Sequence, residues 1–240
     1  MNVGRGGHRS IPHANFAVAR MGAKTGAYEA TIAHDRSPLA AGTLKTFDAV
    51  FLNNTIGPIF HTPALREAFE RFIKTGGGLV ANHAVTVTST DWPAFGEILG
   101  ARGAAHRDAD EKVFVKLDDP NSPLNEAFGG KAFAFADEIF RFQAPYSRSK
   151  VHVLLSVDVA RTNMAQGRPR GACVRPDNDY PISWIRRQGK GRVFYCSLGH
   201  NPRVFWDARI LKHFLAGIQF ALGDLKADAT PDAAVKTPRQ

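Results

Sequence analysis

Two histidines, His83 and His200, each follow an apolar run that is typical of a buried strand. His83 follows the apolar run at 76–82, and His200 follows a second apolar run at 191–199. In an open α/β sheet, ligands bind outside the carboxyl ends of the strands. We therefore expect the two imidazoles to lie over one crevice, where each could act as a base, bind substrate or bind a metal. The alternative for each is a structural role in the core or at a cap.

An acidic pair, Asp137 and Glu138, lies between the aromatic runs at 133–135 and 140–142. Carboxyl groups in apolar surroundings can have a raised pKa and serve as general acid or base. A helix cap or a pairing with arginine would explain the same residues. We assign catalysis to His83, His200 and Glu138, with Glu138 as acid or orienting carboxylate.

Four further residues are expected to bind substrate. His8 and Arg9 lie in a glycine-rich opening, and glycine lets the backbone approach a ligand closely. His106 lies in a predicted loop after a helix, and Asp137 accompanies Glu138. A flexible terminus would explain the first pair equally well.

Nucleophilic chemistry is not expected at the turn that carries His83. Its neighbours are Asn82 and Ala84, so the turn offers no Ser or Cys and no G-x-S-x-G. The two cysteines, Cys173 and Cys196, form no CxxC and are expected to be reduced core thiols, although a disulfide stays open. No H-E-x-x-H is present, so we assign no metal ligand and no certain cofactor. A divalent metal is kept as an alternative.

The elements that must position these residues follow from apolar periodicity. Helices are predicted over 13–26, 62–75, 92–99 and 204–222. Strands are predicted over 28–34, 47–52, 79–82, 112–117, 151–157, 171–175, 180–186 and 192–197. Residues 118–150 are predicted to be irregular, and 161–171 to form an exposed loop. The alternation of strand and helix favours right-handed crossovers and a mostly parallel sheet flanked by helices.

The first strand of such a sheet is apparently missing. A doubly wound domain opens with an apolar strand, but here Val3 is the one apolar residue between Met1 and the glycines at 4–7. We expect this chain to be less soluble than a version extended upstream by a strand, because a lost strand exposes sheet edges. Localisation therefore stays open, cytoplasmic as the chain stands and exported if a leader precedes it.

Composition excludes some classes of function. The chain has 240 residues, 44% of them hydrophobic and 22% charged, which is ordinary for a globular protein. No apolar stretch reaches the length of a membrane span, so no membrane partner is expected. The net charge is +9, but no aromatic residues interleave as a stacking platform with the basic residues at 161–192 and no nucleic-acid motif appears, so nucleic-acid binding is not expected. A homo-oligomer is left open.

Taken together, the segments resemble the ThuA-like family, named for trehalose utilization. The order and spacing of several short motifs carry this resemblance over about residues 8–223: 7–12, 47–48, 72–83, 100–106, 137–138, 181–184, 189–193, 198–200 and the final helix to Gly223. The resemblance implies a flavodoxin-like fold similar to class I glutamine amidotransferases, without their cysteine–histidine–glutamate set. We expect one domain over 1–223 and a disordered tail over 224–240.

The resemblance also implies a role in carbohydrate catabolism, including 3-keto sugars. We expect an enzyme that acts by acid–base chemistry on a glycoside or its keto derivative, with a small carbohydrate as its partner. A ketone acidifies the neighbouring C–H, which a base can remove while a donor stabilises the enolate. The alternatives are a non-catalytic sugar-binding or regulatory domain and a metal-dependent hydrolase. An amidohydrolase using Cys196 is the weakest candidate.

Overall fold

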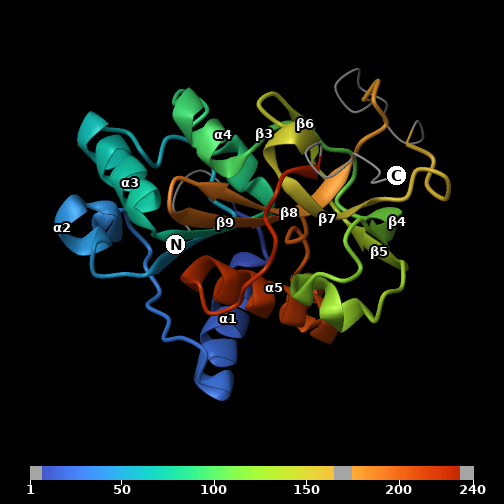
Figure 1. Cartoon of the computed structure of the whole chain (residues 1–240), viewed down its shortest axis with the longest axis horizontal. Helices are drawn as coiled ribbons and strands as arrows, with labels where there is room; N and C mark the ends of the chain where they lie inside the picture. Colours follow the sequence, from blue (N-terminus) through green and yellow to red (C-terminus); the bar gives the residue numbers. More distant parts are fainter. Residues whose placement is uncertain (1–6, 165–174, 233–240) are drawn as a thin grey trace, which may run out of the picture.

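A seven-stranded sheet runs through the molecule, with helices on both of its faces (Figure 1). The computed structural model describes residues 7–164 and 175–232. Helices α2 (Ala41–Leu44), α3 (Pro63–Thr75) and α4 (Pro93–Leu99) lie on one face, and α1 (Ile11–Thr25) and α5 (Ala208–Leu222) lie on the other. Each face has its own hydrophobic core. The α/β class is therefore confirmed.

Three parallel strands occupy one side of the sheet. They are β1 (Ala49–Asn53), β2 (Gly78–Asn82) and β9 (Gly191–Cys196), and their register aligns Asn53, Asn82 and Cys196. Parallel strands end at the same edge of a sheet. The residues that follow β2 and β9 therefore emerge side by side, which places His83 near His200.

The other side of the sheet is antiparallel, whereas a mostly parallel sheet was expected. The strands run in the order β9, β8 (Pro181–Gln188), β7 (His152–Val157), β4 (Glu111–Leu117) and β5 (Phe133–Asp137). Four successive antiparallel pairings return β5 to the direction of β9. The carboxyl end of β5, with Asp137 and Glu138, consequently lies at the same edge as those of β2 and β9.

Shorter elements complete the fold. A separate two-stranded sheet pairs β3 (Arg102–Ala105) with β6 (Arg141–Gln143). Short 3-10 helices connect the larger elements: η1 (Ser37–Leu39), η2 (His83–Val87), η3 (Pro123–Phe128), η4 (Arg148–Lys150) and η6 (Pro202–Trp206). None of the helices in the part of the chain that is described has the length and apolar character needed to cross a membrane.

The helix boundaries follow local chemistry. Thr62 caps α3 by accepting a hydrogen bond from the amide of Leu65 at 3.3 Å, and Gly76 ends the helix. The final helix was predicted from residue 204, but α5 begins at Ala208. The Asp207 carboxylate accepts from the amide of Arg209 at 2.9 Å, so this cap starts the helix later.

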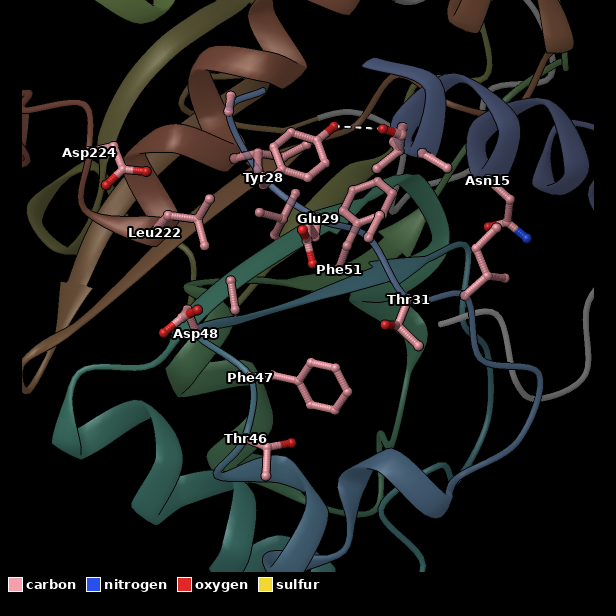
Figure 2. A pocket seen from close by; sticks show the side chains of 18 residues that line it. Asn15, Tyr28, Glu29, Thr31, Thr46, Phe47, Asp48, Phe51, Leu222 and Asp224 are labelled. Atoms are coloured by element: carbon pink, nitrogen blue, oxygen red, sulfur yellow. Dashed lines mark hydrogen bonds between the residues drawn. The ribbon is translucent and has the colours of Figure 1, made fainter. Parts of the chain in front are cut away.

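Residues 28–34 do not form the predicted strand. The segment is extended but unpaired with any described strand, and Ile32 is 45% exposed. Together with β1, α1 and α5 it encloses a cavity of about 690 Å³, into which Phe47 and Phe51 project (Figure 2). Apolar alternation alone does not make a strand, because a strand also needs a hydrogen-bonding neighbour.

Two other expectations also need correction. The region 118–150 was predicted to be irregular, yet it contains β5 and β6. Residues 224–232 were expected to be disordered, but they lie against β7, where the Asp232 carboxylate contacts Arg148 at 2.8 Å. Most of the strand predicted at 171–175, with Cys173, and residues 233–240 lie outside the described residues. No strand precedes α1 in the described part of the chain.

Candidate functional site

Four segments bring imidazoles and a carboxylate together at the carboxyl edge of the sheet. His83 follows β2, His200 follows the end of β9, Glu138 follows β5, and His8 lies just before α1. The ring centroids of His83 and His200 are 5.3 Å apart, and that of His8 lies 5.0 Å and 4.9 Å from them. The expected meeting of His83 and His200 is confirmed. Their chemical roles remain predictions.

Glu138 is the centre of this group, and its carboxylate touches three imidazoles. Its Oε2 lies 3.2 Å from His83 Nε2 and 3.4 Å from His200 Nδ1, and its Oε1 lies 2.9 Å from His106 Nδ1. Burial by itself would raise the pKa of Glu138, but the surrounding imidazoles outweigh it and hold that pKa well below its usual range. Glu138 is therefore a carboxylate at neutral pH, which argues against a general-acid role.

The imidazoles differ in their electrostatics. The contact with Glu138 raises the pKa of both His106 and His200. Burial, followed by the neighbouring His83 and His200, lowers the pKa of His8 to about 4. One group of side chains thus contains an imidazole that stays neutral beside imidazoles that hold protons more readily.

His83 is enclosed and held by backbone carbonyl and hydroxyl groups. It is 0% exposed and has a φ of +48°, a left-handed conformation that non-glycine residues rarely adopt. Its Nδ1 donates to the carbonyl oxygen of Ser197 at 2.8 Å. The Tyr195 hydroxyl donates to the backbone carbonyl oxygen of His83 at 2.7 Å. A carbonyl oxygen can only accept, so the neutral ring carries its proton on Nδ1 and its lone pair on Nε2.

Asp137 holds the loop that carries His200. Its carboxylate accepts from the amides of Gly199, His200 and Asn201 at 2.7, 3.2 and 2.9 Å, and from the Asn201 side chain at 2.9 Å. Burial raises the pKa of Asp137 against the opposing influence of His83 and these amides. Asp137 is 0% exposed, so the structure places it beneath the site rather than on its open surface.

A buried polar network that the sequence analysis missed supports the same loop. The Gly199 carbonyl oxygen accepts from Ser10 Oγ at 2.6 Å and from Asn54 Nδ2 at 3.1 Å, and the amide of Asn54 donates to Asn82 Oδ1 at 3.0 Å. A signal was present in the sequence. Polar asparagines follow the apolar run at 49–52, at the same strand end that led to His83.

The solvent-facing side of the site is formed by His106, His200 and Phe140. The His106 and His200 side chains are 46% and 27% exposed, whereas that of Glu138 is 8% exposed. The Phe140 ring packs edge-on against His83 and His106, with centroids 5.0 and 5.4 Å apart, and forms an apolar wall. Arg9 is exposed next to His8. A ligand that enters would meet His106 and His200 before it meets Glu138 or His83.

A buried ion pair fixes the chain just after Glu138. The Arg141 guanidinium makes two hydrogen bonds to the Glu111 carboxylate at 2.6 and 2.9 Å, and a third to the carbonyl oxygen of Ile139 at 2.7 Å. Bidentate arginine–carboxylate pairs are both strong and geometrically specific. This pair anchors the segment that presents Glu138 to the imidazoles.

Cys196 does not take part in this arrangement as a nucleophile. Burial raises the pKa of its thiol to about 12, so the reactive thiolate is scarce at neutral pH. Its side chain lies in the apolar core below the site.

The comparisons agree with this architecture. A family model described as trehalose utilisation, ThuA, matches residues 2–221. A putative ThuA-like protein from Bacteroides uniformis is similar, with 23% identity, coverage of 91% of this chain and 88% of that one, and a TM-score of 0.73. A second, from Parabacteroides merdae, has 14% identity, coverage of 94% and 90%, and a TM-score of 0.68. No curated protein matches the chain. With the family model spanning nearly all of its elements, this chain belongs to the ThuA family and has a carbohydrate-related role.

Proposed function

We propose that this protein is an enzyme that acts on a keto derivative of a glycoside by proton transfer at the cluster of histidines around Glu138. The observation that carries the proposal is the Glu138 carboxylate, held 2.9–3.4 Å from imidazoles of three separate segments. The family supports a carbohydrate as substrate. A buried carboxylate that orients solvent-facing imidazoles is an arrangement used for acid–base catalysis.

His106 is the group best placed to move a proton. Its half-exposed ring is oriented through Nδ1 by Glu138 at 2.9 Å. A carboxylate that orients an imidazole in this way fixes its tautomer and stabilises its protonated form. His83 is 0% exposed, so we do not assign it to contact with substrate.

The proposed reaction is an elimination from a 3-keto glycoside. The ketone acidifies the C–H bond of the neighbouring C2, and His106 takes that proton while the electron pair forms an enolate. The enolate then re-forms the ketone, a double bond forms between C1 and C2, and the bond from C1 to the leaving oxygen breaks. The departing alkoxide takes the proton back from His106. The products are an unsaturated keto sugar and an alcohol, so atoms and charges balance. His200, whose side chain is 27% exposed beside the same carboxylate, is assigned to donate to the enolate oxygen.

The test is incubation with a 3-keto disaccharide, followed by chromatography of the released sugar. Wild-type protein should release one sugar, and His106→Gln should lower kcat by about 100-fold or more, the usual contribution of a positioned acid–base group. His34→Gln changes an exposed histidine on the unpaired segment at 28–34 and serves as the matched control.

Three results would overturn this proposal. The first is an unaltered substrate with the wild-type protein. The second is full activity of His106→Gln. The third is calorimetric binding of the sugar without turnover, which would indicate the alternative of a non-catalytic sugar-binding protein.

A further inference from the structure

We propose that His8, His83, His200 and Glu138 form a binding site for a divalent transition-metal ion, with Zn²⁺ as the ion that fits best. The inference concerns the cluster to which the proposed function also assigns the chemistry, but metal binding does not depend on that reaction. One potential ligand atom from each of the four residues lies within 4.8 Å of the others. Asp137 and His106 lie outside this set.

The first observation is a set of imidazole nitrogens without hydrogen bonds. His8 Nδ1, His83 Nε2 and His200 Nδ1 are all buried, and none has a hydrogen-bond partner among the described residues. His83 Nε2 and His200 Nδ1 lie near Glu138 Oε2, but they do not meet the geometry of a hydrogen bond to it. Buried polar atoms are normally paired, so three orphaned nitrogens in one place call for a ligand.

The second observation concerns the lone pair of His83. Its Nδ1 proton is committed to the carbonyl oxygen of Ser197, so in the neutral ring the lone pair of Nε2 faces the carboxylate of Glu138 at 3.2 Å. Two lone pairs at this distance repel each other unless a proton or a metal cation lies between them, and a metal cation would also bind the neighbouring nitrogens. A backbone carbonyl that takes the distal N–H is also the usual way in which proteins orient a metal-binding histidine.

The third observation is the spacing of the ligand atoms. A tetrahedral zinc ion with ligands at about 2.1 Å places neighbouring ligand atoms about 3.4 Å apart. Glu138 Oε2 lies 3.2 Å from His83 Nε2 and 3.4 Å from His200 Nδ1. The spacing on this side of the cluster thus already suits an ion, and no two of the four ligand atoms lie more than 4.8 Å apart.

The surroundings of the ligands also fit a metal site. Oε1 of Glu138 contacts His106 Nδ1 at 2.9 Å. This contact orients the carboxylate so that Oε2 faces His83 and His200. The Asp137 carboxylate holds the His200 loop through three backbone amides. Such outer contacts fix the orientation of metal ligands and are part of a working site.

The donor types select the class of ion. Three imidazoles and one carboxylate, without a thiolate, suit Zn²⁺ and its neighbours in the first transition row. Mg²⁺ and Ca²⁺ prefer oxygen ligands and are poorly served by such a set. A bound ion beside His106 would act as a Lewis acid toward a carbonyl or hydroxyl oxygen of the substrate.

The experiment measures metal binding without any substrate. Protein stripped with a chelator is titrated with Zn²⁺ by calorimetry, and Co²⁺ is added separately to record its visible absorption. We expect one ion per chain and a cobalt spectrum typical of a site with nitrogen and oxygen ligands. His200→Ala should weaken Zn²⁺ binding by at least about 100-fold, because loss of even an outer contact costs about 10–100-fold.

The matched control is His152→Gln, which removes another imidazole beside carboxylates. His152 Nε2 lies 3.0 Å from Asp119, outside the cluster, so this variant should bind Zn²⁺ like the wild type. Absence of a stoichiometric ion on the wild-type protein would overturn the proposal, even if a variant fails to fold. Equal weakening in His200→Ala and His152→Gln would overturn it too. Stoichiometric binding without turnover of a keto disaccharide would contradict only the proposed function.

Discussion

At the scale of single residues, Glu138 contacts the imidazoles of the site, and its neighbour Asp137 holds the loop that carries His200. Adjacent carboxyl groups at the end of β5 have separate tasks, because one faces imidazole side chains and the other faces backbone amides. The sequence indicated both residues but not this division. The direction of each side chain depends on which loops pack around the strand end.

Asp137→Asn tests the task of Asp137. Each carboxylate oxygen accepts two of the four hydrogen bonds from 199–201, and an amide offers one acceptor oxygen, so two of the four are lost. We expect the free energy of unfolding to fall by about 1–3 kcal/mol, the usual cost of leaving buried polar groups unpaired. Chemical denaturation measures this, with the exposed Asp48→Asn as control. A variant as stable as the control would show that Asp137 does not hold the loop.

Gly199→Ala tests how closely the strand ends approach each other. Gly199 has a φ of +152°, and an added Cβ would lie 2.6 Å from Asn82 Nδ2 and 3.1 Å from His83 Cβ. We expect a loss of about 1–3 kcal/mol from backbone strain and displaced side chains, together with lower activity. Gly42→Ala, where an added Cβ meets no atom within 4 Å, should leave the melting temperature almost unchanged. Similar melting temperatures for the two variants would contradict this account.

At the scale of elements, α5 carries a second buried histidine with a structural task. His213 contacts the Leu124 carbonyl oxygen at 2.7 Å and Ser183 Oγ at 2.8 Å, so it ties α5 to η3 and β8. Phe128 and Phe194 pack against its ring. Its surroundings are apolar, which separates it from the polar cluster around Glu138.

The stability of the fold should depend on pH through His213. Burial lowers the pKa of His213 from 6.5 to about 4. Between these values the unfolded chain binds a proton that the folded chain does not, so the free energy of unfolding falls as the pH drops. The stability is fully present above pH 6.5, and about 3 kcal/mol of it is lost toward pH 4 and below.

Urea denaturation at several pH values measures this dependence. His213→Gln cannot titrate at this position, so its free energy of unfolding should change less between pH 6.5 and pH 4. Parallel curves for the variant and the wild type would show that other groups cause the loss.

At the scale of the whole molecule, the C-terminal segment is tied to the antiparallel side of the sheet. The Asp232 carboxylate contacts the Arg148 guanidinium at 2.8 Å, and Arg148 also binds Asp118 and Asp179 at 2.9 Å each. The Asp232 amide donates to the Val151 carbonyl oxygen at 3.2 Å. A segment that composition marks as disordered is thus held by backbone hydrogen bonds to β7 and its flank and by an arginine shared among three carboxylates.

Asp232→Ala should release this segment. We expect a small loss of stability, about 0.5–1.5 kcal/mol, because the ion pair is partly exposed to solvent. Limited proteolysis is the sharper measurement, since cleavage near residue 225 should become faster. The exposed Asp228→Ala is the control. Equal cleavage rates for the two variants would contradict docking through Asp232.

The sequence by itself determined the local features of this protein. Apolar periodicity located α3 and the buried strands β2 and β9, and the polar residues after those strands indicated His83 and His200. These signals are readable because a helix or a buried strand leaves its period in consecutive residues. The same reasoning failed at 28–34, where an extended run has no hydrogen-bonding neighbour among the described strands.

Only the tertiary structure decided which groups meet. The antiparallel pairings from β9 to β5 set the direction in which β5 ends, and thereby bring Glu138 to the imidazoles. The β3–β6 pairing places His106 at the opening. Strand partners are chosen by contacts between residues far apart in the chain, which leave no period in the sequence. Individual members of the site, Glu138 included, were therefore predictable, whereas the convergence of the imidazoles on Glu138 and the orphaned nitrogens required the fold.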